Sequence, residues 1–268
     1  RVNLIEAYDQ PWKRQLEGTV GGYWGLFDAY RRDVKYPPDA PITNFPAWKL
    51  LMTCGMILSA LTFLVAIVTL RRRPWTPRAV SWIAVAISAT TAGCLLGIAA
   101  DKMFYESLGT GGWLKWGALL AAAVASPLLC AHEQMTGRPL PALLDLLGPR
   151  DGRTHSMPTI LLGIVLAVTA VIAAETALGF VFDPRYRDFP YASLTMAIIP
   201  FMGMAVLNRP QAGARPVAEA VFAGVLAFAA VYVAINEGRD NWQSLWTCAM
   251  YFLLAFTLWR ARAAQSPG

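Results

Sequence analysis

A short run near the start of the chain gathers side chains whose chemistry suits carbohydrate binding. The run EAYDQPWK places two carboxylates, an amide, an indole and an ammonium group within eight residues, at Glu6, Asp9, Gln10, Trp12 and Lys13. Carboxylates and amides bond to paired hydroxyls, and an indole face stacks on the apolar face of a sugar ring. The same residues also suit a plain surface turn that holds a buried tryptophan. By composition alone, both interpretations stay open.

The order of these residues resembles the end of the catalytic barrel of glycoside hydrolase family 17, the β-1,3-glucanases and glucanosyltransferases. The resemblance lies within the first 36 of 268 residues. Gln10 stands where the family commonly has a glutamate. The side chain at this position is therefore uncharged and can bind a sugar only by hydrogen bonds. Two spaced motifs carry the match: Glu6-Ala7-Tyr8-Asp9 with Pro11-Trp12-Lys13, and Trp24-Gly25-Leu26-Phe27-Asp28 with Lys35-Tyr36.

The resemblance implies a place for the run in a larger fold. It makes EAYDQPWK the C-terminal end of the last strand of a (β/α)8 barrel and its loop, the face where barrel enzymes build their sites. Trp24 would pack against the closing helix of the barrel. The residues that would help to bind β-glucan are Glu6, Asp9, Gln10, Trp12 and Lys13.

A barrel end followed by membrane helices is also similar to bacterial membrane-bound β-glucan synthases. In that family the chemistry is retaining, with one carboxyl as acid and a second as nucleophile, both on earlier barrel strands. Those residues would precede Arg1. We therefore expect this chain to be a fragment of an enzyme, and we expect the fragment to hold no catalytic residue, metal or cofactor.

Composition places most of the chain in a lipid bilayer. Hydrophobic residues make up 56% of it and charged residues 15%, and the mean hydropathy is +0.42, which is too apolar for a typical soluble domain. The net charge of +6 does not indicate nucleic-acid binding, because the basic residues lie in short loops between apolar runs. The four cysteines show no CxxC spacing and no nearby histidine ligand set, which favours packing over metal binding.

The apolar runs predict an all-α polytopic membrane domain with about seven transmembrane helices. Each run is long enough, at 1.5 Å per residue, to cross about 30 Å of hydrocarbon. Residues 37–48 hold four prolines and are typical of a stiff linker between residues 1–36, the barrel remnant, and residues 49–268, the membrane domain. The runs lie at about 49–70, 79–100, 113–132, 157–180, 190–208, 217–235 and 242–259.

The charges of the loops predict the orientation. If the segment before the first run is outside, the cytoplasmic loops carry eleven Lys and Arg residues and the exterior loops carry four. Short cytoplasmic loops hold the excess of positive charge. We therefore expect a multi-pass protein of the bacterial inner membrane, with residues 1–48 on the periplasmic or exterior side and the C-terminus in the cytoplasm.

Within the membrane domain, charged residues are the first candidates for function because charge is costly there. Lys115, Glu175 and Glu219 are such residues. Gly93 and Gly97 form a GxxxG motif, which predicts close helix packing, and Pro127 and Pro200 predict tolerated kinks.

These features favour the C-terminal, membrane-anchoring part of an enzyme that makes or remodels β-glucan on the exterior side, by hydrolysis or glycosyl transfer. Its partners would be β-glucan, the lipid bilayer and other polysaccharide-synthesis proteins. Two alternatives come from different classes: a seven-helix transporter or channel, and a structural scaffold for a polysaccharide synthase. A transporter would need convergent polar residues along the bundle axis and often shows internal repeats, neither of which is evident in the sequence.

Overall fold

Helices make up nearly all the regular structure of the chain. The computed structural model describes residues 6–36, 39, 45–72, 79–142, 156–183, 187–211 and 213–263. These residues contain a 3-10 turn, η1 (Pro11–Lys13), and a short helix, α1 (Arg14–Gly21). Seven longer helices follow in the described part: α2 (Trp48–Arg71), α3 (Ala79–Glu106), α4 (Gly109–Thr136), α6 (Met157–Phe182), α7 (Tyr191–Leu207), α8 (Val217–Glu237) and α9 (Trp242–Arg260).

Every apolar run of the sequence forms a helix, so the prediction of a helical, multi-pass membrane domain is confirmed. Five of the helices are long and apolar enough to cross a membrane: α2, α3, α4, α6 and α8. The third run, predicted at 113–132, extends to Gly109–Thr136 because polar residues continue the helix beyond both apolar ends. Helix α7 has only 17 residues, or about 25 Å at 1.5 Å per residue, and α9 has 19.

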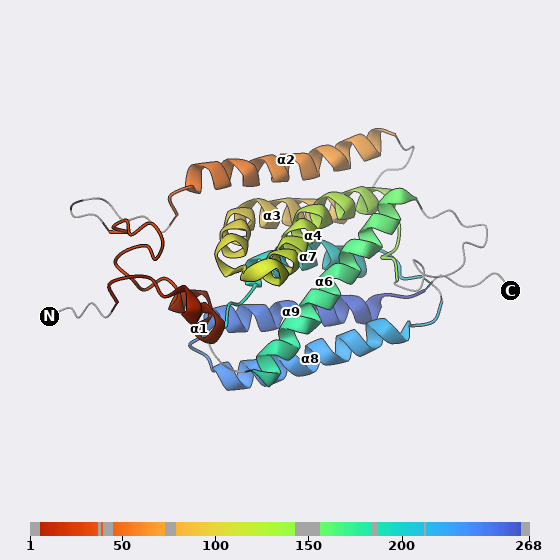
Figure 1. Cartoon of the computed structure of the whole chain (residues 1–268). Helices are drawn as coiled ribbons and strands as arrows, with labels where there is room; N and C mark the ends of the chain where they lie inside the picture. The colour runs from red at the N-terminus through yellow and green to blue at the C-terminus, as the bar shows by residue number, and fades with distance from the viewer. Residues whose placement is uncertain are drawn as a thin grey trace.

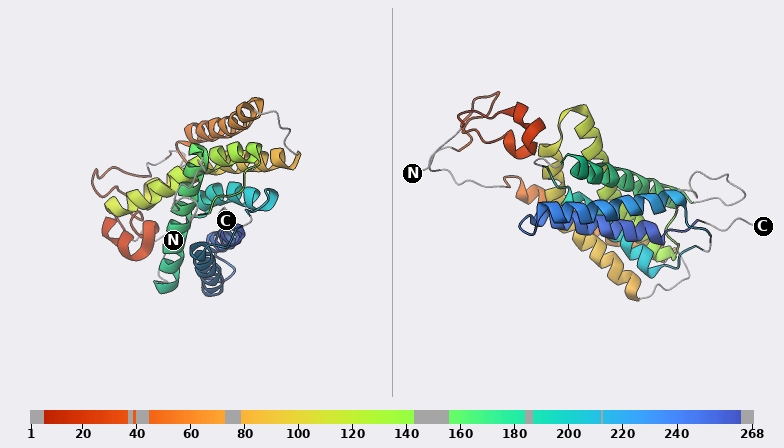
Figure 2. Two further views of the ribbon diagram at one scale, coloured as in Figure 1. Left: turned by 90° about the vertical axis from the view of Figure 1, so that its right-hand side faces the viewer. Right: turned by 90° about the horizontal axis from the view of Figure 1, so that it is seen from below.

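Helix α7 lies at the centre of the bundle (Figure 1). It contacts α3, α4 and α9, and its buried residues point in all directions around the helix axis. A helix that is apolar all round is stable where neighbours enclose it. Helix α2 lies at one edge, against α3 and α4, and α8 lies at the opposite edge, against α6 and α9 (Figures 1 and 2).

Two prolines lie inside helices, Pro127 in α4 and Pro200 in α7. The hydroxyl of Ser126 donates a hydrogen bond of 2.7 Å to the carbonyl of Ala197, which joins the two helices close to both prolines. Hydroxyls from a neighbouring helix are one way in which proline-containing helices satisfy their backbone in a membrane.

Helices α2 and α3 approach closely through glycine. A Cβ atom added to Gly55 would lie 2.1 Å from the carbonyl oxygen of Gly93, and one added to Gly93 would lie 2.1 Å from the hydroxyl of Ser59. Ser59 donates a hydrogen bond of 2.7 Å to the carbonyl of Ala89 across the same contact. The predicted close packing by the glycine motif is therefore confirmed, and its partner is a helix of the same chain.

The N-terminal segment, residues 6–36, is held by isolated bridges. Tyr8 and Phe27 form a parallel bridge, and Phe27 and Val34 form an antiparallel one. No strand occurs in the described residues, and the strand-like run 1–5 lies outside them, as does most of the predicted linker at 37–48. The described residues therefore do not show a barrel remnant.

The glycine contact predicts a specific sensitivity. Gly55→Ala should destabilise the helical bundle by about 1–3 kcal/mol, because the new methyl group meets a backbone oxygen that has no room to move. Thermal unfolding of the detergent-solubilised protein measures the effect. Gly224→Ala in α8 is the matched control, since nothing lies within 4 Å of its added Cβ. Equal stability of the two variants would contradict the close contact.

Candidate functional site

A buried carboxylate holds the N-terminal segment together. Asp9 is 6% exposed, and its Oδ1 accepts hydrogen bonds from the backbone N–H of Gly25 at 2.9 Å and from Nζ of Lys35 at 2.7 Å. A Cβ on Gly25 would lie 2.1 Å from the backbone nitrogen of Asp9, so this approach requires glycine. Asp9 thus joins three distant parts of the segment, and direct contact between its carboxylate and a sugar stays a prediction.

The other four predicted residues come together, with Trp24 beside them, although the side chain of Glu6 is only 9% exposed. Trp12 is 61% exposed and Trp24 is 55% exposed. Nζ of Lys13 lies 5.8 Å from the ring centroid of Trp12 and 5.7 Å from that of Trp24. Lys13 also forms an ion pair with Glu6. We call Glu6, Gln10, Trp12, Lys13 and Trp24 the aromatic cluster.

Hydrogen bonds orient the side chains of the aromatic cluster. Nε1 of Trp12 donates to Oε1 of Gln10 at 2.8 Å, which fixes both the indole and the amide. The hydrogen bond from Lys13 to Glu6, together with the negative charges of Glu6 and Glu17, raises the pKa of Lys13 against a smaller opposing effect of burial. The ammonium group is therefore charged at neutral pH, and it lies 5.8 Å and 5.7 Å from the two indole ring centroids.

The exposure of the tryptophans excludes one detail of the sequence interpretation, the buried tryptophan. A turn around a buried Trp12 is wrong, because most of its ring is open to solvent. Trp24, predicted to pack against a closing helix, is also exposed, and its ring lies near Lys13 instead. Two open indoles beside one ammonium group are the arrangement that the structure presents.

The N-terminal segment docks on one end of the helical bundle (Figure 1). The guanidinium of Arg14 donates to the carbonyls of Tyr105 and Ser107, and the Thr19 hydroxyl donates to Oδ2 of Asp188 at 2.7 Å. The rings of Tyr23 and Tyr105 meet edge to face at 5.9 Å. These contacts fix the place of the aromatic cluster relative to the membrane helices.

A polar cavity of about 310 Å³ lies where the segment meets the bundle. Two of the charged residues singled out in the sequence, Lys115 and Glu175, line it and pair at 3.1 Å across α4 and α6. Nζ of Lys115 also lies 4.5 Å from the ring centroid of Trp116. The other charged lining residues are Arg14 from the N-terminal segment and Asp183, Arg187 and Asp188 from the stretch between α6 and α7.

A second charged cluster, at the opposite ends of α4 and α6, is not anticipated by the sequence analysis. Glu133 is fully buried, and its Oε1 accepts a hydrogen bond of 3.0 Å from the hydroxyl of Thr159 on α6. Arg138 donates to the same hydroxyl at 3.1 Å. The sequence feature that could have indicated this cluster is the polar run His132-Glu133-Gln134 at the end of an apolar stretch. Glu219, the third charged candidate, is buried near the start of α8.

No family model, curated protein or solved structure matches the chain. Within the described residues, no group of three or more His, Cys, Asp or Glu side chains is placed to hold a metal ion. The site is therefore interpreted from its own geometry.

The role of Asp9 can be tested apart from any ligand. Asp9→Ala removes two hydrogen bonds to a charged acceptor, each worth about 1.5–3 kcal/mol, so the N–H groups of Gly25 and Phe27 should exchange with solvent about tenfold to a hundredfold faster. Hydrogen exchange read by mass spectrometry measures this. Asp33→Ala is the control, because that side chain is 68% exposed and pairs only with Arg31 at 3.7 Å. Unchanged exchange in the Asp9 variant would show that the segment is held by other contacts.

Proposed function

We propose that this chain is the membrane-embedded part of an enzyme that makes or remodels β-glucan, and that the aromatic cluster binds the glucan. One observation carries the proposal: two exposed indoles, Trp12 and Trp24, flank the ammonium group of Lys13 on a segment fixed to the helical bundle. Exposed apolar side chains that lie together mark interaction sites, whereas single exposed ones are normal on a protein surface.

The chemistry of the cluster suits a β-linked glucose chain. Such sugars carry axial C–H bonds on both ring faces, which stack on indoles, and equatorial hydroxyls at the rim, which need donors and acceptors. Lys13 supplies a charged donor and Gln10 supplies an amide beside it. Glu6, whose side chain is only 9% exposed, holds Lys13 in place through their ion pair. Asp9 stabilises the cluster indirectly, because it accepts a hydrogen bond from Gly25, the residue next to Trp24.

The resemblance of residues 6–36 to the end of a glycoside hydrolase family 17 barrel supports the same proposal. The parent enzyme would then carry its acid and nucleophile on earlier strands and act by a retaining mechanism. Nucleotide sugars are cytoplasmic, so a domain on the exterior side would rearrange glucan that has already been made. The polar cavity next to the cluster would lie on the path between glucan and bilayer.

We further propose that all seven long helices cross the membrane, with the N-terminal segment outside. The excess of Lys and Arg in alternate loops supports this orientation. Helix α7 is short for a span, but it is enclosed by α3, α4 and α9, so few of its residues need to reach the lipid.

Sugar binding gives a direct test. Trp12→Ala should weaken binding of a β-1,3-glucan oligosaccharide about tenfold to a hundredfold. The reason is that losing a stacked aromatic ring costs on the order of 1–3 kcal/mol of binding free energy. Trp24→Ala should have a similar effect because both rings face Lys13. Calorimetric titration of the full chain in detergent measures the dissociation constants, and thermal unfolding checks that the variants are folded.

The matched control is Tyr30→Ala, which removes another exposed aromatic of the same segment, 83% open to solvent. This variant should bind as the original chain does. If Trp12→Ala keeps both its unfolding temperature and its affinity, the aromatic cluster does not bind glucan and the proposal fails.

The topology gives a second test. Single cysteines in place of Asp39 and Asp240, in a chain whose four native cysteines are replaced, should both react with a membrane-impermeant maleimide added to intact cells. Asp240 lies between α8 and α9, which is outside only if α7 crosses the membrane. Labelling at 39 without labelling at 240 would show that α7 does not span.

A further inference from the structure

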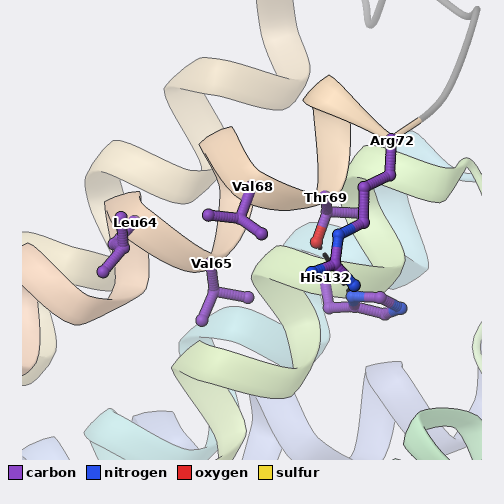
Figure 3. Close-up of a pocket in the computed structure, with 6 residues that line it drawn as sticks. All are labelled: Leu64, Val65, Val68, Thr69, Arg72 and His132. Atoms are coloured by element: carbon purple, nitrogen blue, oxygen red, sulfur yellow. Dashed lines mark hydrogen bonds between the residues drawn. The ribbon is translucent and has the colours of Figure 1, made fainter.

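A groove at the edge of the bundle is lined by apolar residues at one end and by basic residues at the other. It lies between α2 and α4 and has a volume of about 550 Å³ (Figure 3). Helix α2 contributes one continuous stripe, in the order Leu64, Val65, Val68, Thr69 and Arg72, at the spacing that places residues on one helix face. His132 of α4 completes the lining beside Thr69 and Arg72.

The polar end of the groove is structurally ordered. The hydroxyl of Thr69 lies 2.9 Å from Nδ1 of His132, which fixes the orientation of the imidazole ring. Figure 3 shows the side chain of Arg72 running back from the end of α2 toward this pair. Two nitrogen-rich side chains thus line one end of the groove, and no acidic residue is among its lining residues.

The depth of the groove matches the two parts of a lipid. Helix α2 is one of the helices long and apolar enough to cross a membrane, and it ends at Arg71, next to Arg72. The basic end of the groove therefore lies at the level of the headgroups, and the apolar end lies one to two turns deeper, in hydrocarbon. Leu64 and Val68 are 51% and 39% exposed, so the apolar wall is open to a chain lying against it.

The basic end also suits the anionic part of a lipid. A guanidinium binds a phosphate with two parallel hydrogen bonds, and these charge-assisted bonds are among the strongest in proteins. Glu133, the acidic neighbour of His132 in sequence, is bound to Thr159 on the other side of α4 and does not line the groove.

We infer that this groove binds an anionic phospholipid, with the phosphate held by Arg72 and His132 and one acyl chain lying along Leu64, Val65 and Val68. This inference does not depend on the proposed function, because it concerns a different face of the molecule. It assigns to α2, the most lipid-exposed of the membrane helices, a lipid that stays bound to it.

The test is retention of phosphatidylglycerol. The full chain is reconstituted with equal amounts of phosphatidylglycerol and phosphatidylcholine, extracted in mild detergent, and weighed by native mass spectrometry. The original chain should keep phosphatidylglycerol in preference. Arg72→Gln should lower its retention about tenfold or more by removing the bidentate donor, and Val68→Trp should lower it by filling the apolar wall.

Arg71→Gln is the matched control, because it removes a neighbouring arginine that does not line the groove, and it should retain phosphatidylglycerol as the original chain does. Circular dichroism and thermal unfolding confirm that each variant is folded. Equal retention by the Arg72 and Arg71 variants would overturn the inference, and so would equal retention of the two lipids by the original chain.

Two further outcomes would replace the phospholipid by another occupant and so also overturn the inference. Binding of inorganic phosphate by the delipidated chain, with no retention of either lipid, would show that the groove holds a phosphate without an acyl chain. A dimer of the original chain that becomes a monomer in Val68→Trp would show that the groove is an interface between two copies.

Discussion

The interior of a bilayer offers no hydrogen-bond partner to the backbone, and this constraint determines most of the structure. Each apolar run must satisfy its own N–H and C=O groups, which only helices and closed barrels achieve in lipid. Helix association then depends on close packing and on a few polar bonds, because lipid tails are as apolar as the side chains. The glycine contact between α2 and α3 and the bond from Ser126 to α7 are contacts of these two kinds.

The N-terminal segment depends on a different principle. Its 31 described residues are too few to bury a core of their own. It is stabilised by one buried carboxylate, Asp9, and by the bonds that Arg14 and Thr19 make to the bundle. The surface of the segment can therefore carry exposed tryptophans without loss of order, because the contacts that hold it lie elsewhere.

Local patterns predicted the helices and the close helix packing at the glycine motif, but not the polar contacts between distant residues. Seven apolar runs are visible in the sequence because hydropathy is a property of neighbouring residues. The role of Asp9 depends on Gly25 and Lys35, which lie 16 and 26 residues away, and nothing near Asp9 in the sequence indicates them. The place of the Trp24 ring beside Lys13 is unpredictable for the same reason, since the two residues are distant in the sequence. Glu133 was missed because its partner, Thr159, is contributed by another helix.

The two charged clusters on α4 and α6 bear on whether the helices conduct a solute. Lys115 and Glu175 lie at one end of this helix pair, and Glu133 and Thr159 lie at the other, about 27 Å away along α4 at 1.5 Å per residue. The residues between them belong to one buried apolar core cluster: Leu119, Ala123 and Cys130 on α4, and Leu162, Leu166, Ala170 and Ala173 on α6. The hydroxyls in this stretch, Ser126 and Thr169, are bonded to backbone carbonyls. A close-packed apolar layer between two charged ends separates the polar groups that a transport path would need to connect, so the geometry of this helix pair favours an anchoring role over conduction.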